Sequence, residues 1–280
     1  MFQIVSKKYL NSTVCEMMIK APLVAKKAQA GEFIILRVDE DGERIPLTVA
    51  GFDREKGLVR IIFQIVGATT MKLGHKNEGE YISDFVGPLG KETEVEGLKK
   101  VCVVGGGVGS AIALPLAERL YKEGANVTTI TGFRSKDLII LQDEFAKTSN
   151  HHILTTEDGS AGFNGNVCMP LEEMLSSGEK FDKIFAIGPL IMMKFVVQTA
   201  KKYNVPCTVS MNPIMIDGTG MCGCCRLSVD GETKFACVDG PDFDGYKVDF
   251  DEALFRGGMY RAEEQKKREE TCNLFKSEVK

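Results

Sequence analysis

Cysteines are concentrated in one short stretch near the C-terminus. The segment reads Asp217-Gly-Thr-Gly-Met-Cys222-Gly-Cys224-Cys225, and Cys237 follows a little later. A C-x2-C pair with a third cysteine one short hairpin away is typical of iron or zinc sites. Plant-type [2Fe–2S] loops have the spacing C-x4-C-x2-C…C. In that register the ligand positions are Asp217, Cys222, Cys225 and Cys237, so a carboxylate takes the first position and Cys224 lies between ligands.

Two other interpretations of these cysteines remain open, a structural zinc site and a disulfide knot. The chain has nine cysteines, an odd number that favours metal ligation in a reducing compartment over a disulfide framework. Its first residues, MFQIVSKKYLN, contain no apolar core of a signal peptide. Glycines and a proline interrupt the longest apolar run, residues 101–117. We therefore expect a cytoplasmic protein without a membrane span.

Composition sets limits on fold size and on partners. A chain of 280 residues is long enough for roughly two domains. The content of 44% hydrophobic and 26% charged residues is ordinary for a globular protein. The net charge of -4 argues against nucleic acid as the main partner, because phosphate binding favours basic surfaces.

Residues 1–96 are predicted to form an all-β domain, a small barrel or sandwich. Alternating or β-branched runs are separated by turn residues, and they occupy residues 2–5, 14–19, 33–38, 44–49 and 58–65. Gly87-Pro88-Leu89-Gly90 is predicted to be a rigid turn close to the domain boundary.

Residues 97–210 alternate between strand and helix patterns, which predicts a doubly wound parallel sheet. The expected strands are residues 101–104, 126–131, 153–155, 183–187 and, as the last one, 206–210. The expected helices are residues 111–123, 136–148, 167–176 and 190–203. Residues 211–245 would then form the cysteine module, with a hairpin turning at Asp230-Gly231. Residues 246–280 would form a charged helical tail.

Two glycine-rich turns lie between a strand and a helix. Gly105-Gly-Gly107-Val-Gly109-Ser110 is the first, and Gly188-Pro189 is the second. Glycines let the backbone approach a pyrophosphate, and the helix N-terminus offers free N–H groups. In a doubly wound sheet both turns fall at the carboxyl edge, where ligands bind. Residues 156–160, which include Asp158, lie on the same edge and could contact a ribose or form an ordinary polar loop.

The residues do not decide between NAD and NADP. The acidic residue that usually follows the second strand is absent, and the strand ends at Arg134 and Lys136. These cations could bind a 2′-phosphate or lie free on the surface.

In the β-domain, Arg44-Ile-Pro46-Leu47-Thr48 places a cation and a hydroxyl on one strand. Such groups can contact a phosphate and a heterocycle. The turn Val66-Gly67-Ala-Thr69-Thr70 offers small residues and hydroxyls suited to a pyrophosphate.

The order of these parts resembles the ferredoxin-reductase-like electron-transfer subunits: R-x-P-x-[ST] and G-x-x-T in a barrel, then glycine turns, then a cysteine loop. The resemblance covers roughly residues 1–245. It implies a β-barrel plus α/β fold, with an FAD barrel, a Rossmann-like nucleotide domain and a small C-terminal [2Fe–2S] module. Within this family, dihydroorotate dehydrogenase electron-transfer subunits use four cysteines. The small subunits of NADH-dependent reduced ferredoxin:NADP oxidoreductases have aspartate first, as Asp217 is here.

The resemblance also implies the site residues. FAD would be held by Arg44, Pro46, Leu47, Thr48, Gly67, Thr69, Thr70 and Gly87, with Thr48 near the flavin N5. The nicotinamide nucleotide, expected to be NAD(H), would be held by Gly105, Gly107, Gly109, Arg134, Asp158, Gly188 and Pro189. The cluster would be bound by Asp217, Cys222, Cys225 and Cys237.

The implied function is electron transfer, in which NADH reduces FAD and single electrons pass to the cluster. A larger partner subunit would carry a second flavin, [4Fe–4S] clusters and the NADP(H) site, and would contact ferredoxin. The whole complex would be electron-bifurcating. Alternatives are a subunit that serves dihydroorotate dehydrogenase or a sulfide/polysulfide dehydrogenase. From a different class, the chain could be a redox sensor or a zinc-stabilised binding module without turnover.

Overall fold

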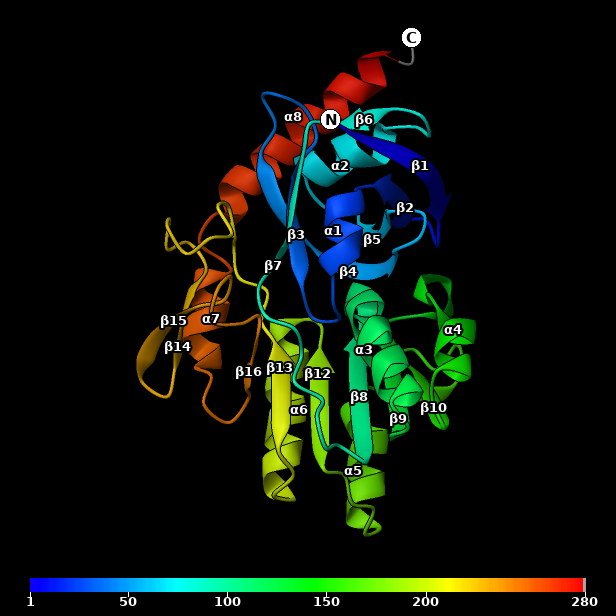
Figure 1. The fold of residues 1–280 in the computed structure, drawn as a ribbon. Coiled ribbons are helices and arrows are strands. Elements are labelled where there is room, and N and C mark those ends of the chain that lie inside the picture. Colours follow the sequence, from blue (N-terminus) through cyan, green and yellow to red (C-terminus); the bar gives the residue numbers. More distant parts are fainter. Residues whose placement is uncertain (279–280) are drawn as a thin grey trace.

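The computed structural model describes residues 1–278, with side chains described up to residue 272. Figure 1 shows a β-barrel above an α/β domain, with the C-terminal segment running along one side of both. Within the described residues, no helix combines the length and the apolar character needed to cross a membrane.

The barrel is a seven-stranded antiparallel sheet in the order β6-β1-β2-β5-β4-β3-β7. Its strands are β1 Phe2–Tyr9, β2 Val14–Lys20, β3 Phe33–Arg37, β4 Arg44–Asp53, β5 Leu58–Gln64, β6 Tyr81–Ile82 and β7 Asp84–Leu89. The two edge strands, β6 and β7, are separated only by Ser83. The sheet must therefore curl until its edges meet, which gives a near-closed barrel with its own apolar core.

The sequence predicted that residues 1–96 would be all-β. In the structure, two short helices interrupt the strands of this domain. Helix α1, Pro22–Lys27, begins with proline at its first turn, a position where the missing N–H is no loss. Helix α2, Ala68–His75, begins at the segment predicted to be a turn. The prediction for Gly87-Pro88-Leu89 was also wrong, since these residues belong to β7.

The second sheet has the strand order β11-β10-β9-β8-β12-β13-β16. Its strands are β8 Lys100–Gly106, β9 Asn126–Phe133, β10 His151–Thr156, β11 Phe163–Asn164, β12 Lys183–Ile187, β13 Cys207–Ser210 and β16 Asp242–Asp244. Pairing is parallel throughout except for β16, which runs antiparallel to β13. The prediction that residues 206–210 form the last strand of the sheet was therefore wrong, because the chain returns later to add β16.

Helices cover both faces of this sheet, as the alternation of side chains along β8 requires. Val101 and Val103 pack with α3, Ser110–Lys122. Cys102 and Val104 face the opposite side, where α5, Cys168–Ser176, and α6, Leu190–Lys202, supply the apolar partners.

The predicted helix over residues 136–148 is broken in the structure. A short 3-10 turn, η2 Lys136–Leu138, is followed by α4, Gln142–Lys147. Between them, Leu141 has a left-handed φ of 60°, and Ile140 is buried in a cluster shared with the barrel. Contact with the other domain has therefore overridden local helix propensity.

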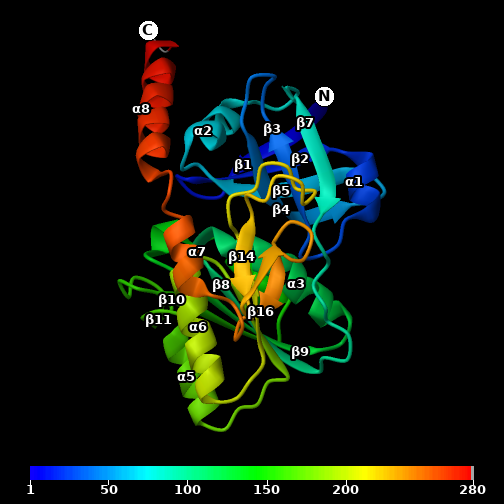
Figure 2. The ribbon, with the colours of Figure 1, turned by 90° about the vertical axis from the view of Figure 1, so that its left-hand side faces the viewer.

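The C-terminal part adds a hairpin and two helices. The hairpin, β14 Arg226–Val229 and β15 Glu232–Phe235, turns at Asp230-Gly231 as predicted. Helix α7, Phe250–Arg256, is capped by the carboxylate of Asp249. Helix α8, Arg261–Glu278, packs against α2 and stands beside the barrel in Figure 2.

Candidate functional site

The cysteine loop lies directly against the barrel. It leaves the end of β13 and contains Gly218, which has a left-handed φ of 84°. A Cβ atom on Gly218 would lie 2.7 Å from Leu89 Cδ1 and 3.0 Å from Ile35 Cγ1. The backbone conformation favours glycine here, and a larger residue would also displace side chains of β3 and β7. The loop is therefore part of the interface between the barrel and the C-terminal module.

The structure brings the predicted cysteine ligands to one end of the hairpin. Cys225 and Cys237 flank β14 and β15, are both buried, and have Sγ atoms 3.2 Å apart. Cys222 is exposed. All nine cysteines are free thiols in the structure.

The pKa values of Cys222 and Cys237 are shifted in opposite directions by their surroundings. Backbone N–H groups of Cys224 and of Asp217 lower the pKa of Cys222. Burial, followed by the hydrogen bond with Cys225, raises the pKa of Cys237 to about 12. The N–H contacts therefore favour the thiolate at Cys222, which is the form that binds metals.

Asp217 lies in the same loop, and donors of that loop hold its carboxylate. Oδ2 accepts hydrogen bonds from the backbone N–H of Thr219 at 2.9 Å, from the Thr219 hydroxyl at 2.5 Å and from the N–H of Met221 at 3.2 Å. These bonds, led by the Thr219 hydroxyl, lower the pKa of Asp217, and Arg44 adds to the effect. Sequence reasoning missed Thr219, although Asp-x-Thr is a known signal for such a turn.

The donor set fits an iron–sulfur cluster in its chemistry. Three thiols and one ionised carboxylate lie on a single glycine-rich loop and hairpin, and soft thiolates are the usual ligands of iron–sulfur centres. In the part of the chain that the structure describes, no three acidic, cysteine or histidine groups are already arranged around one metal position.

The predicted flavin residues lie on two elements of the barrel. Arg44, Pro46, Leu47 and Thr48 follow one another along β4, and all are half-buried. Arg44 Nε donates to the carbonyl oxygen of Ile216 at 2.8 Å. The strand predicted to hold FAD thus contacts the loop predicted to hold the cluster.

The predicted pyrophosphate residues form the N-terminus of α2. The Thr70 hydroxyl bonds the backbone of Val66 and Gly67, and the Thr69 hydroxyl donates to Glu43 Oε2 at 3.2 Å. A Cβ atom on Gly67 would meet nothing within 4 Å, so this helix end is open to a phosphate. Gly87 lies in β7, packed against Ile34.

The predicted nucleotide residues meet where the strand order reverses, between β8 and β12. Gly105 lies next to the end of β8, Gly107 and Gly109 belong to a 3-10 turn, and α3 follows. A Cβ atom on Gly109 would lie 2.6 Å from Gly188 Cα, so the two glycine turns touch. Ser110, at the start of α3, has a buried hydroxyl without a hydrogen-bond partner. This edge is where doubly wound sheets bind nucleotides.

The remaining predicted residues lie on the same edge. Pro189 immediately precedes α6. Arg134 is exposed, and its carbonyl oxygen accepts from the N–H of Asp158 at 3.2 Å. The Ser160 hydroxyl bonds Asp158 and lowers its pKa. His152 is partly buried and stacks on Phe145.

Comparisons with known proteins agree with this arrangement. Residues 212–249 match the iron–sulfur cluster binding domain of dihydroorotate dehydrogenase B. The chain is 48% identical over 263 residues to a dihydroorotate dehydrogenase B (NAD(+)) electron transfer subunit homolog of Thermotoga maritima, covering 94% of this chain and 93% of that protein. It is 31% identical to the corresponding electron transfer subunit of Streptococcus pneumoniae R6, covering 86% and 94%.

Solved structures give the same result. One chain of an NADH-dependent reduced ferredoxin-NADP oxidoreductase superposes with a TM-score of 0.91 at 48% identity, covering 96% of each chain. A ferredoxin reductase of carbazole 1,9a-dioxygenase shares the fold at a TM-score of 0.62 and 17% identity, covering 73% and 65%. The predicted ferredoxin-reductase-like fold with a C-terminal iron–sulfur module is confirmed, and the assignment of individual ligands and domain boundaries stays a prediction.

Proposed function

Since the chain belongs to the family of dihydroorotate dehydrogenase B electron-transfer subunits and their homologues, we propose that it is the small subunit of an NADH-dependent reduced ferredoxin:NADP oxidoreductase. It is an oxidoreductase subunit whose cofactors are FAD, NAD(H) and an iron–sulfur cluster. When bound, FAD converts the two-electron chemistry of NADH into one-electron steps that such a cluster accepts.

The observation that carries this proposal is the contact between β4 and the cysteine loop. Arg44 bonds Ile216, and Gly218 packs on Leu89 and Ile35. This contact places the proposed flavin strand beside the proposed cluster loop, so electrons have a short path between the two cofactors. Asp217, ionised in the first ligand position, favours the ferredoxin:NADP type over a four-cysteine subunit.

We assign the ligands as the family resemblance implies them. FAD is held by Arg44, Pro46, Leu47, Thr48, Gly67, Thr69, Thr70 and Gly87. NAD(H) is held by Gly105, Gly107, Gly109, Arg134, Asp158, Gly188 and Pro189. The [2Fe–2S] cluster is held by Asp217, Cys222, Cys225 and Cys237. The open N-terminus of α2 and the touching glycine turns support the first two sets.

The partner in this proposal is a larger subunit with a second flavin, [4Fe–4S] clusters and the NADP(H) site, through which ferredoxin is reached. Nine free thiols suit a reducing compartment, and we place the complex in the cytoplasm. In the bifurcating direction, the complete assembly divides electrons from NADPH between ferredoxin and NAD⁺, and the reverse direction forms NADPH from NADH and reduced ferredoxin.

Purification under anaerobic conditions with identification of the companion chain tests the proposal. We expect a larger chain to co-purify, and the complex to form NADPH from NADP⁺ only when NADH and reduced ferredoxin are both present. The names of the relatives favour a second candidate, an electron-transfer subunit of dihydroorotate dehydrogenase. Reduction of orotate by NADH, with no NADPH formed, would select that candidate.

A further inference from the structure

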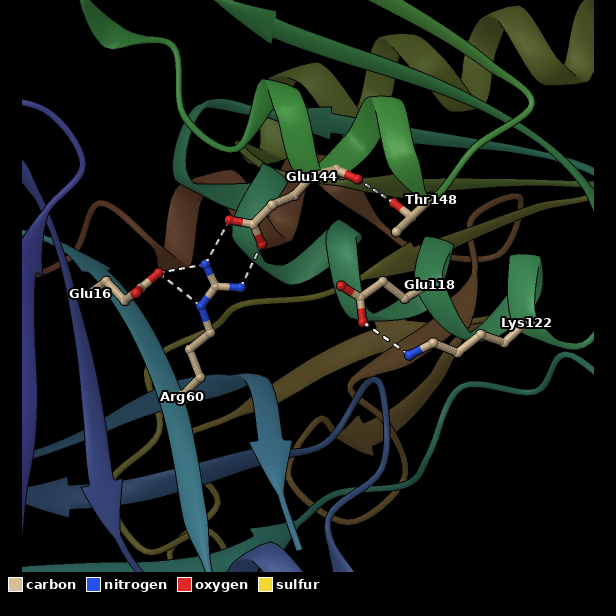
Figure 3. A network of polar contacts seen from close by, with 6 residues as sticks. All are labelled: Glu16, Arg60, Glu118, Lys122, Glu144 and Thr148. Atoms are coloured by element: carbon tan, nitrogen blue, oxygen red, sulfur yellow. Dashed lines mark hydrogen bonds and ion pairs between the residues drawn. The ribbon is translucent and has the colours of Figure 1, made fainter. Parts of the chain in front are cut away.

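One arginine joins the barrel to the nucleotide domain (Figure 3). Arg60 lies on β5 and donates to Glu16 Oε2 of β2 from Nε, at 2.8 Å, and from Nη2. On its other side it donates to Glu144 of α4, from Nη1 to Oε2 at 2.8 Å and from Nη2 to Oε1 at 3.0 Å. The Arg60 side chain is only 17% exposed. It is therefore fixed between one carboxylate of its own domain and one of the other domain.

An apolar cluster lies in the same interface. The barrel contributes Val14, Ala50 and Ile62, and the nucleotide domain contributes Ala111, Phe133 and Ile140. Apolar contact is strong but non-directional. A guanidinium that bonds both oxygens of a carboxylate is directional. The contact between Arg60 and Glu144 therefore adds a directional restraint on the angle between the two domains.

That angle matters because the interface includes elements of both proposed cofactor sites. Arg60 pairs in register with Gly51 of β4, the strand that also carries Thr48. Val108 of the glycine turn packs on the apolar cluster. Helix α3, which follows this turn, packs against β4. A rotation of one domain would move the glycine turn relative to β4.

We propose that Arg60 and Glu144 are a positioning pair, which fixes the angle at which the nucleotide domain presents the nicotinamide to the flavin side of the barrel. This inference rests on the proposed function. Neither residue touches the reacting atoms. Their effect is on geometry, and a misplacement of about 1 Å can slow a reaction roughly 100-fold.

The chain offers a matched pair of variants for the test. Glu144→Gln weakens the contact between domains, whereas Glu16→Gln weakens an equivalent contact of the same arginine within the barrel. In rapid mixing of the full flavin-containing chain with NADH, we expect Glu144→Gln to lower the limiting rate of flavin reduction about tenfold. The NADH concentration at half-saturation should change less than about twofold, because the binding groups are intact. Glu16→Gln should leave both values within about twofold of wild type.

Amide hydrogen exchange without NADH gives a readout that is independent of turnover. Glu144→Gln should speed exchange in η2 and α4, which face the barrel, and Glu16→Gln should not. Arg60→Lys keeps the positive charge but cannot bond both carboxylates in the same way, so it should behave like Glu144→Gln. If Arg60→Lys had the same limiting rate as the wild type, the positive charge alone would be sufficient to fix the angle between the domains.

Two results would overturn the positioning role while leaving the proposed function intact. One is a limiting rate in Glu144→Gln within twofold of wild type, and the other is an equal loss of rate in Glu16→Gln. A wild-type flavin that NADH does not reduce would refute the proposed function, and the positioning role with it.

Discussion

The carboxylate of Asp217, the proposed oxygen ligand among sulfurs, is held by donors of its own loop. Thr219 and Met221 bond only Oδ2. These bonds lower the pKa of Asp217, so the group stays anionic without a metal partner. An oxygen donor gives one iron less electron density than a thiolate does, and ligand type is one of the factors that set a cluster's potential.

Replacement of Asp217 therefore has a defined outcome. We expect Asp217→Cys to keep its iron and to shift the midpoint potential of the cluster, measured by spectroelectrochemical titration. Asp217→Ala should lower iron affinity by at least the roughly tenfold loss that even outer-shell changes cause, measured as iron per protein. Asp239→Ala is the control, because Asp239 bonds the N–H of Phe235 but is not a proposed ligand. An unchanged potential in Asp217→Cys, or full iron in Asp217→Ala, would contradict the ligand role.

A second residue-scale prediction concerns Gly107, whose φ of 54° is left-handed. Alanine at this position would meet no atom within 4 Å, so its cost is backbone strain of about 1–2 kcal/mol. Gly124, with φ of 91° and equally open surroundings, is the matched control outside the nucleotide turn. We expect Gly107→Ala and Gly124→Ala to lose similar stability in denaturant unfolding. Only Gly107→Ala should weaken NADH binding in a titration, and equal NADH affinity in the two variants would be evidence against the assignment.

At the scale of elements, β4 joins two sites that are far apart in the sequence. Its register pairs Arg44 with Arg37 of β3, yet the two arginines have different partners. Arg37 bonds Asp84 of β7 at 2.7 Å, whereas Arg44 bonds Ile216 in the cysteine loop. The strand therefore links proposed flavin contacts to the position of the proposed cluster.

This difference separates Arg44→Gln from Arg37→Gln. We expect Arg44→Gln to lower both the FAD and the iron content of the purified protein, because it removes a proposed flavin contact and loosens the loop. Arg37→Gln should leave both contents unchanged and affect only stability, by about 1 kcal/mol or less for a partly exposed pair. Absorption spectra and iron analysis measure both cofactors in one sample. Loss of FAD without loss of iron in Arg44→Gln would show that the loop does not depend on this bond.

Elements were predictable from sequence where the local pattern and the tertiary environment agree. The apolar run at Val101 and the turn at Asp230-Gly231 gave a buried strand and a hairpin, as expected. The prediction of one helix over residues 136–148 was wrong, because Ile140 packs against the barrel and interrupts the helix. The cysteine spacing indicated an iron–sulfur loop, but no local pattern could place Arg44 beside Ile216, which lies 172 residues away.

At the scale of the whole molecule, one apolar cluster contains side chains of all three predicted modules. Phe33 and Ile35 of the barrel belong to the same buried cluster as Cys225 and Cys237, together with side chains from both β12 and α6. A second cluster joins the barrel to the nucleotide domain. Residues packed in one cluster open as one cooperative unit, so we expect the modules not to unfold independently.

This shared cluster predicts how removal of iron will affect stability. A ligand that binds only the folded state stabilises every part that unfolds with its site. We expect chelation of iron to lower the temperature of flavin release and of backbone unfolding together, in one transition, measured by flavin fluorescence and circular dichroism.

Cys222→Ser should reproduce the shift, since Cys222 is exposed and its substitution has little direct cost. Cys224→Ser is the control and should keep both its iron and its unfolding temperature. If flavin release stayed at the native temperature while the remainder unfolded earlier, the barrel would be an independent unit and the shared cluster would not couple the cofactor sites.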